Sequence, residues 1–330
     1  MQTALRERPV TPALRVGRTS LGQRLWAARW CYVLMAPSAL LLLLFSFYPL
    51  FASWYYSLFD WNGVGRPGYF VGLQNFVELV HDEYFWGDFG RSLWFAAVTT
   101  PAEMIVSLLI AILLNDRALR LGPLFRTFFF IPVVTTTAVM SIVMSFVFAA
   151  FQGPVNQVLL DLHLTSRSID FLGNPHSVMW VAMLIFVWKW MGQPMIYWLA
   201  GLQTIPSELY EAARVDGARW WAQTAHVTAP LMIPFAIIIG LITAVGNLQV
   251  FAFLQALTGG GPFFSSETME LFIFRTAFGT VSNGAASGNP RFGYASAAGV
   301  LFGLCVMVVV AIQALALRRY RPSRTGVAAR

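Results

Sequence analysis

Apolar residues are gathered along this 330-residue chain into six runs, which polar or turn-rich stretches separate. The runs cover residues 31–59, 93–114, 128–151, 178–202, 231–256 and 294–317. A helix that crosses a bilayer needs about 20 consecutive, mostly apolar residues, and each run reaches that length. A helix satisfies its backbone hydrogen bonds within one segment, whereas short strands in lipid would leave open edges. The pattern therefore predicts an all-α membrane protein with six transmembrane helices.

The first run follows a basic start, which is also typical of a secretory signal. Such a signal has an apolar stretch of only about 7–15 residues and a small-residue cleavage site. Run 31–59 is longer, and no convincing cleavage site follows it. Four aromatic residues gather at its far end, as they do at a membrane interface: Trp54, Tyr55, Tyr56 and Trp61. We expect the run to be retained as the first transmembrane helix.

The composition excludes a soluble protein. Hydrophobic residues make up 57% of the chain and charged residues 11%, whereas a soluble domain carries about 25% charged residues. The net charge of +7 comes from arginine, because Lys189 is the only lysine. No nucleic-acid motif accompanies this charge. We therefore expect no nucleic-acid partner and attribute the arginines to membrane topology.

The positions of the arginines orient the chain. Sixteen of the 21 arginines lie in four places, namely residues 1–30, the loops 115–126 and 203–230, and the segment from Arg318 onward. All four places fall on one side of a six-span chain, and such an excess marks the cytoplasmic side. We expect both termini in the cytoplasm, with residues 1–30 and 319–330 as basic tails around a membrane domain at 31–318.

The loop at 203–230 holds the most distinctive motif, Glu211-Ala212-Ala213 followed by Asp216-Gly217-Ala218. Pro206 should break the preceding span, and Ser207 can cap a new helix. Ala213 and Gly217 are four residues apart, so we expect them to share a face of low bulk that fits a groove on another protein. Gly217 should end or bend this helix. An ordinary amphipathic connector is the alternative, but it leaves the small residues between charges unexplained.

These residues, with Pro230 and Pro234 after them, resemble the EAA loop of ABC-importer permeases. In that family the short coupling helix of the loop sits in a cleft of a cytoplasmic ATPase subunit. Segments 190–206 and 257–262, the latter reading Leu-Thr-Gly-Gly-Gly-Pro, resemble the carbohydrate-uptake branch of the family. Members of this branch are maltose-type inner-membrane components of binding-protein-dependent transport systems. The resemblance covers roughly residues 30–318, which is the whole membrane domain.

The resemblance implies the type I importer permease fold and a place in the plasma (inner) membrane of a bacterium or archaeon. It also implies partners: a second homologous permease subunit, two copies of a cytoplasmic ABC ATPase, an extracytoplasmic solute-binding protein, membrane lipid and a carbohydrate substrate. ATP and Mg would bind the partner ATPase, and the coupling helix would relay its movements to the spans. Glycerol 3-phosphate or another polar metabolite is the alternative solute.

The chain departs from the family pattern in several places. Thr224 and Ala229 stand where Phe and Leu are usual, which alters the packing expected behind the coupling helix. Ala252 replaces an acid that is common in the sugar branch, which weakens any substrate contact carried over to that position. Residues 280–289 are rich in Gly, Ser and Asn and predict a small, flexible insertion at a loop tip.

Two ionisable residues, Glu103 and Lys189, fall inside predicted spans, where charges are costly and therefore suggest function. Trp188 and Trp190 flank Lys189 and are suited to stacking on the apolar face of a sugar. One hypothesis is that Lys189 or its neighbours line the substrate path. The other is that Lys189 pairs with a polar group of a partner helix. For Glu103 a structural role is the favoured interpretation.

Three amide residues of the fifth run, Asn247, Gln249 and Gln255, are further candidates for the substrate path. Amides read sugar hydroxyls by hydrogen bonding, so they fit that role. Polar residues also hold membrane helices together, which is the structural alternative.

The sequence predicts no catalytic or metal site. A phosphate-binding loop needs Gly-x-x-x-x-Gly-Lys, and Lys189 lies instead in Val-Trp-Lys-Trp-Met. The four histidines are scattered and form no recognisable constellation. We expect a non-catalytic subunit that binds no metal or cofactor itself. A secondary transporter would leave the EAA loop unexplained, and a membrane-embedded enzyme would need clustered catalytic residues.

Overall fold

The computed structural model describes residues 22, 26, 28–115, 121–282, 285–287 and 289–319. The chain divides into two compact units, residues 1–52 and 53–330. The first unit contains α2 (Arg29–Leu42), the π-helical turn η1 (Leu43–Phe47) and the start of α3 (Tyr48–Tyr56). Together α2, η1 and α3 make one apolar helix of 28 residues. The prediction of a first helix at 31–59 is therefore confirmed.

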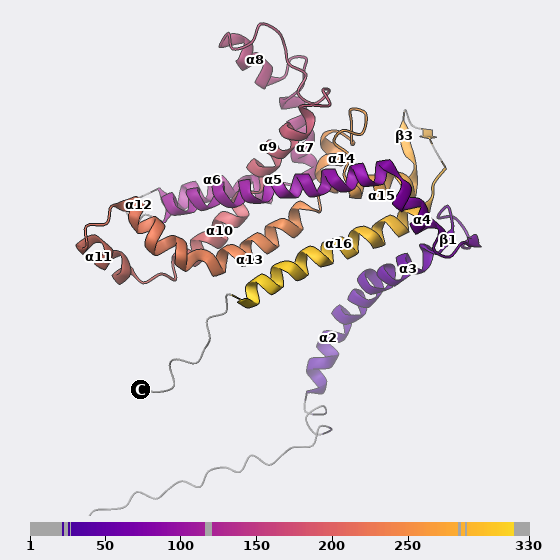
Figure 1. The fold of residues 1–330 in the computed structure, drawn as a ribbon, viewed down its shortest axis with the longest axis horizontal. Coiled ribbons are helices and arrows are strands. Elements are labelled where there is room, and N and C mark those ends of the chain that lie inside the picture. The colour runs from indigo at the N-terminus through magenta and orange to yellow at the C-terminus, as the bar shows by residue number, and fades with distance from the viewer. Residues whose placement is uncertain are drawn as a thin grey trace, which may run out of the picture. The chain divides into compact units, whose positions relative to one another are not determined.

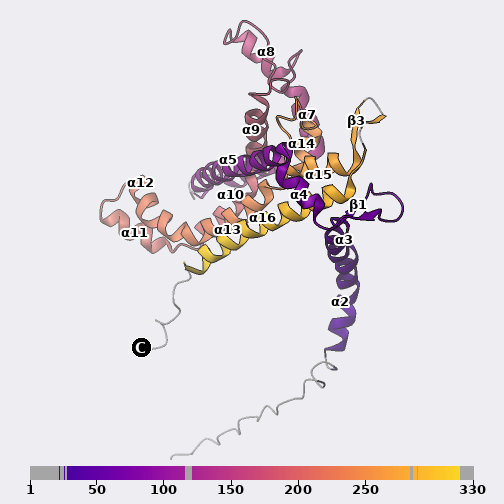
Figure 2. The same ribbon diagram turned by 45° about the vertical axis from the view of Figure 1, so that its right-hand side comes forward.

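The second unit is built around long apolar helices. α13 (Ala229–Asn247) packs against both α5 (Glu83–Leu114) and α16 (Phe292–Arg319), and the three run lengthwise through the unit (Figures 1 and 2). α12 (Trp220–Gln223) and η2 (Thr224–Thr228) lead into α13 without a gap and extend its apolar helix to 28 residues. These helices correspond to the second, fifth and sixth predicted runs.

The third predicted run is not a straight helix. α6 (Gly122–Val134) and α7 (Thr137–Val147) meet at an angle of 96°. The backbone is extended at Thr135 and Thr136, with ψ angles of 142° and 127°. Pro132 stands inside α6, which continues to Val134, so the break falls at these two threonines. The expectation of one continuous helix over 128–151 is therefore wrong, whereas a single crossing by the bent pair stays a prediction.

The fourth and fifth predicted runs also contain breaks. α9 (Val178–Trp190) and α10 (Gly192–Leu202) are separated only by Met191, whose N–H still bonds to the carbonyl of Val187 at 2.9 Å. The fifth helix ends at Asn247, and a separate helix α14 (Phe251–Leu257) follows, so a continuous helix over 231–256 is wrong. The described residues hold four helices that could cross a membrane, or five if α6 and α7 count as one crossing. The all-helical membrane fold is thus present, while the number six remains a prediction.

Short elements lie in the loops between the long helices. They are the helices α4 (Gln74–His81), α8 (Pro154–Asp161), α11 (Ser207–Val215) and α15 (Met269–Phe278), and the strands β1 (Phe59–Asp60), β2 (Tyr69–Phe70), β3 (Thr280–Ser282) and β4 (Ala285–Ser287). β1 pairs with β2 and β3 pairs with β4, each antiparallel. The β3–β4 pair occupies the predicted insertion at 280–289, of which residues 283, 284 and 288 lie outside the described residues.

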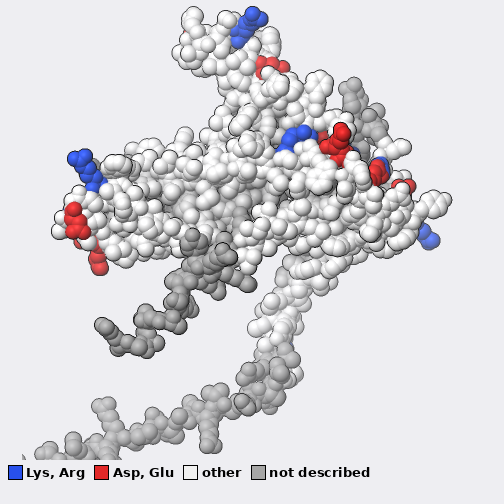
Figure 3. Space-filling view, viewed as in Figure 1, with Lys and Arg blue, Asp and Glu red and all other residues white. Residues whose placement is uncertain are grey.

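Charged side chains gather at the ends of the second unit. On the face drawn in Figure 3 they lie over α11 at one end, over α4, α5 and α15 at the other, and over α8. Among the described residues, the stretch between the two ends shows no charged side chain on that face, although many large apolar side chains are exposed there. An exposed apolar band between polar ends suits a lipid environment. We refer below to the α11 end and the α15 end of the unit.

Candidate functional site

A cavity of about 300 Å³ lies inside the second unit, among α5, α7, α9, α10, α13 and α14. Its polar lining residues are Glu103, Thr137, Gln193, Thr243, Asn247 and Gln249, and its aromatic ones are Phe186, Trp190, Tyr197 and Phe253. The helix breaks shape this wall, because α13 stops at Asn247 and the chain turns before α14 begins. Non-helical backbone at membrane depth is found where it lines such a cavity.

Glu103 and Asn247 are joined in one polar network on the cavity wall. The side-chain nitrogen of Asn247 lies 3.3 Å from Glu103 Oε1, 2.9 Å from Thr99 Oγ1 and 3.2 Å from Thr100 Oγ1. Thr99 and Glu103 are one turn apart on α5, so they present their polar atoms to the same point of α13. Both Glu103 and Asn247 are buried, and polar contacts of this kind connect membrane helices.

The cavity brings together four of the seven residues suggested for the substrate path. Glu103, Trp190, Asn247 and Gln249 line it. Trp188, Gln255 and Lys189 do not: Trp188 and Gln255 are exposed elsewhere on their helices, and Lys189 is fully buried outside the cavity lining. Ala252, the position without the family's acid, is a further lining residue.

Lys189 lies at the break between α6 and α7. Its Nζ donates to the carbonyl oxygens of Pro132 and Thr135, both at 3.1 Å. Pro132 lies in the last turn of α6 and Thr135 is the residue that caps its end, where carbonyls carry the negative end of the helix dipole and lack helical partners. The ammonium also lies 4.5 Å from the centre of the Trp190 ring. Lys189 therefore satisfies the α6 terminus from within the same chain.

Three residues that the sequence did not point to, Phe186, Gln193 and Tyr197, complete the cavity wall beside Trp190. In the order Phe186, Trp190, Gln193 and Tyr197, the four follow one another at spacings of four, three and four residues. This spacing keeps them on one helical face across the interruption at Met191. Gln193 Nε2 donates to the Tyr197 hydroxyl at 3.1 Å. The helical period of this stripe was available in the sequence, but Gln193 and Tyr197 stand in a segment we examined only for family resemblance.

The loop with the Glu-Ala-Ala motif forms α11 at one end of the unit (Figure 1). Glu211, Ala212, Asp216 and Gly217 are exposed, whereas Ala213 and Ala218 are half-buried. Gly217 has φ +78°, in the left-handed region that favours glycine, and it directly follows the end of the helix. The N–H of Ala218 bonds to the Ala213 carbonyl at 2.9 Å and closes the turn. The prediction that Gly217 ends the helix is confirmed.

Two details of this loop differ from expectation. Ser207 does not cap α11, because the N-cap position is Pro206 and no side chain caps the helix. Ala213 and Gly217 do not share a helical face, because α11 ends at Val215 and Gly217 turns the chain away. Of the motif residues, Glu211 and Ala212 are exposed on α11 itself, and Asp216 and Gly217 are exposed in the turn that follows it.

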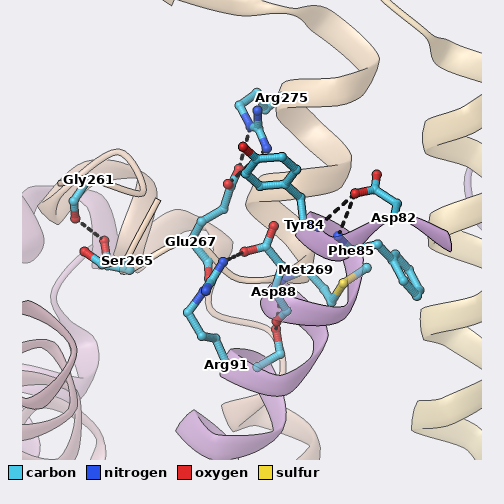
Figure 4. Close-up of polar contacts among 12 residues, drawn as sticks. Asp82, Tyr84, Phe85, Asp88, Arg91, Gly261, Ser265, Glu267, Met269 and Arg275 are labelled. Carbon is cyan, nitrogen blue, oxygen red and sulfur yellow. Dashed lines mark hydrogen bonds and ion pairs between the residues drawn. The ribbon is translucent and has the colours of Figure 1, made fainter. Parts of the chain in front are cut away.

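Four charged residues form a cluster at the α15 end (Figure 4). Arg91 pairs with Asp88 on α5, and Arg275 binds both carboxylate oxygens of Glu267, at 2.7 and 3.1 Å. Arg91 Nε also donates to the Glu267 carbonyl at 2.9 Å, which ties the loop before α15 to α5. Burial raises the pKa of Glu267, and the bonds from Arg275 oppose this rise.

A second contact at the α15 end connects the start of α16 with α4. Arg291 donates to both carboxylate oxygens of Glu78, each at 2.6 Å. These bonds lower the pKa of Glu78 and raise that of Arg291. Tyr294 and Asp82 add a hydrogen bond of 2.6 Å between the same segments. Among the described residues no group of three or more His, Cys, Asp or Glu side chains could hold a metal ion.

Comparison with known proteins places this architecture in a family. Residues 103–322 match the model of the family described as "Binding-protein-dependent transport system inner membrane component". The lactose transport system permease protein LacF of Rhizobium radiobacter is 32% identical over 303 residues, covering 91% of this chain and 97% of LacF. The probable ABC transporter permease protein YurN of Bacillus subtilis is 31% identical over 296 residues, covering 89% of this chain and 96% of YurN.

A solved structure supports the fold. It is the bacterial ABC transporter for alginate, an acidic polysaccharide, in complex with a periplasmic protein that holds an alginate pentasaccharide. Its matching chain has a TM-score of 0.78 at 21% identity, and the match covers 93% of this chain and 99% of that one. Two findings lead to one conclusion: the family match over residues 103–322, and the 31–32% identity to YurN and LacF over nearly the full length of the chain. The chain belongs to the binding-protein-dependent transport system inner membrane components and is a non-catalytic permease subunit of an ABC importer.

Proposed function

We propose that this permease conducts a saccharide and that the cavity beside Asn247 is part of its path. The observation that carries the proposal is the composition of the cavity wall. Aromatic rings at Phe186, Trp190 and Phe253 can face the apolar side of a sugar ring, while amides at Gln193 and Gln249 can bond its hydroxyls. Lys189 takes no direct part and holds the α6–α7 break behind Trp190.

A buried donor on the wall supports this assignment. The indole N–H of Trp190 has no hydrogen-bond partner among the described residues. A buried donor without a partner is costly, so it is a natural point for an acceptor oxygen of a solute. LacF, named for lactose, and the alginate transporter are relatives whose solutes are saccharides.

The proposed subunit has six spans with both termini in the cytoplasm. The bent pair α6–α7 forms the third and α9–α10, nearly continuous at Met191, forms the fourth. Support for this orientation comes from the arginine distribution, which favours the α11 end as the cytoplasmic one. To test this, Cys31 and Cys305 would be replaced by Ala, and single cysteines introduced by Ser287→Cys or Ser323→Cys. An impermeant thiol reagent applied to whole cells should label the first variant and spare the second; the reverse pattern would overturn the orientation.

Coupling is assigned to residues 211–218. Glu211 and Ala212 are exposed on the short helix α11, and Asp216 and Gly217 are exposed directly after it. This exposure suits docking into a cleft of a partner ATPase, which would hold ATP and Mg. A second permease subunit, a second ATPase copy and an extracytoplasmic solute-binding protein complete the proposed importer. The periplasmic protein in the alginate transporter structure supports the last of these partners.

The cavity assignment can be tested by filling it. Thr243→Trp places a large ring in the cavity, whereas Ile238→Trp places the same ring at an exposed position of α13. In proteoliposomes that contain the complete importer, Thr243→Trp should abolish ATP-dependent sugar uptake while the subunits still co-purify. Ile238→Trp should retain uptake. Equal uptake by both variants would show that the path does not pass through this cavity.

A further inference from the structure

The cavity wall has an unbalanced set of charges. Among its lining residues, all within the described part of the chain, Glu103 is the one carboxylic acid, and none is Lys, Arg or His. The remaining polar groups are amides, hydroxyls and the Trp190 indole. Sites that take carboxylates or phosphates usually present Arg or Lys, or the N-terminus of a helix, to the anion. The described wall supplies no cationic side chain. Two helices begin on it, α7 at Thr137 and α14 beside Ala252, and at α14 the Phe251 N–H already donates to a Glu270 carboxylate oxygen at 2.7 Å.

Three basic side chains of the second unit, Lys189, Arg91 and Arg275, already have polar partners in the protein. Lys189 lies within 4.5 Å of the Trp190 ring, but its side chain is fully buried and bonded to the Pro132 and Thr135 carbonyls. Arg91 and Arg275 belong to the ion-pair cluster with Asp88 and Glu267 at the α15 end. None of these three residues lines the cavity.

From this distribution we infer that the solute carries no negative charge. It is a neutral or amine-bearing saccharide, and uronates and phosphorylated sugars are rejected. This inference rests on the proposed role of the cavity as the sugar path. It makes Glu103 a specificity-determining residue and separates this permease from importers of acidic polysaccharides such as alginate.

The inference holds for either protonation state of Glu103. If the carboxyl is ionised, an anionic solute meets a like charge at close range in a site of low dielectric constant. If the carboxyl is neutral, the anion leaves water without any cation to replace its hydration. A neutral saccharide avoids both costs, since the Glu103 carboxyl and the Asn247 amide can bond its hydroxyls in either state.

Charge-matched probes can test selectivity apart from the solute-binding protein. The purified importer complex, without its binding protein, would be titrated with lactose, maltose, cellobiose, digalacturonate, lactose 6-phosphate and the deacetylated chitosan dimer. Binding would be measured by equilibrium dialysis. We expect the tightest ligand to be neutral or amine-bearing, with at least tenfold weaker binding of both anionic probes. Tightest binding of digalacturonate or lactose 6-phosphate would overturn the inference.

A matched pair of variants makes the test independent of the native solute. Gln249→Arg adds a cation to the cavity wall, and Gln255→Arg adds the same cation to α14 outside the lining. Both native side chains are exposed, so both variants should fold. Gln249→Arg should improve digalacturonate binding at least tenfold, and Gln255→Arg should leave it unchanged. Equal binding by both variants would contradict the inference.

The Thr243→Trp variant distinguishes the two possible failures. If it abolishes binding of an anionic probe that the wild type prefers, the cavity is the sugar path but its charge selectivity is the reverse of our inference. If no probe binds, or binding survives Thr243→Trp, the proposed path itself is wrong and the inference falls with it.

Discussion

The hydroxyl of Tyr210, on α11, lies 2.9 Å from the hydroxyl of Thr228, directly before α13. This bond joins the exposed helix at the α11 end to the base of the long helix that ends at Asn247. A displacement of α11 therefore reaches α13 through a side-chain contact as well as through the intervening chain. Gln223 supports the same turn by donating to the Ala218 carbonyl at 2.7 Å.

We predict that Tyr210→Phe weakens the link between ATP hydrolysis and uptake. The variant loses one hydrogen bond, worth about 0.5–1.5 kcal/mol, and keeps the ring packing. In proteoliposomes the amount of solute moved per ATP should fall by up to about tenfold, while ATP hydrolysis continues. Thr228→Val should have the same effect, and the double variant should be no worse than either single one. Additive losses would show that the two hydroxyls act separately.

Gly217→Asp should prevent docking of the ATPase. Apart from its two chain neighbours, no described residue has an atom within 4 Å of the place that a Cβ at Gly217 would occupy, so the side chain fits in the isolated subunit. The left-handed backbone still disfavours it by about 1–2 kcal/mol, and a charge buried in a partner's cleft adds a larger cost. The variant should reach normal abundance, lose uptake and co-purify poorly with the ATPase. Arg219→Ala, also exposed, should be much milder, and normal transport by Gly217→Asp would refute the coupling assignment.

Lys189→Met should destabilise the subunit without changing solute preference. The variant leaves the Thr135 carbonyl without its donor, at a cost of about 1–3 kcal/mol for an unpaired buried group, whereas the Pro132 carbonyl keeps its bond from the Thr135 hydroxyl. We expect a lower melting temperature in detergent and weaker uptake in proportion to the folded protein. Lys189→Arg keeps the positive charge and should recover part of the stability. A change in the ranking of sugar probes, with stability intact, would instead place Lys189 on the path.

The Glu78–Arg291 pair predicts a specific dependence on pH. Its bonds lower the pKa of Glu78 below the ordinary value of 4.5, so the ionised carboxylate stabilises the folded state above that pH. This contribution is lost as the pH falls through the lowered pKa. The pair is partly exposed and should contribute less than about 1 kcal/mol. Arg291→Gln should lower the melting temperature slightly at pH 7, and the difference should disappear at low pH; a constant difference across pH would exclude this origin.

The sequence predicts the long helices well where an apolar run is uninterrupted. Runs 31–59, 93–114 and 294–317 correspond to continuous helices, even though Pro37 and Pro101 stand inside the first two. The breaks at Thr135–Thr136 and after Asn247 are different. They fall within apolar stretches, where composition gives no boundary, and tertiary contacts stabilise them. One such contact is the Lys189 ammonium, from a residue more than fifty positions away.

The candidate site could be predicted only in part for a similar reason. Glu103 and Asn247 stand out as polar residues in apolar runs, but their pairing joins positions 144 residues apart. The pairing depends on how α13 packs on α5, which no local pattern specifies. The sequence did not point to Asp88 and Glu267 because each lies within a predicted loop, where an acidic residue is ordinarily exposed to water. Their burial becomes evident only when Arg91 and Arg275 are seen beside them.

The contact between Lys189 and the α6 terminus has a consequence for biosynthesis. A lysine at the centre of a single inserting segment disfavours membrane insertion by about 2.5–3.5 kcal/mol. The carbonyls that accept hydrogen bonds from this ammonium belong to the preceding apolar segment. They can offset the cost of the lysine only if α6 and α7 lie beside the fourth segment while it inserts. The third and fourth segments should therefore enter the bilayer as one hairpin. When fused alone to a reporter, segment 178–202 should insert poorly, and it should insert well when 122–147 precedes it.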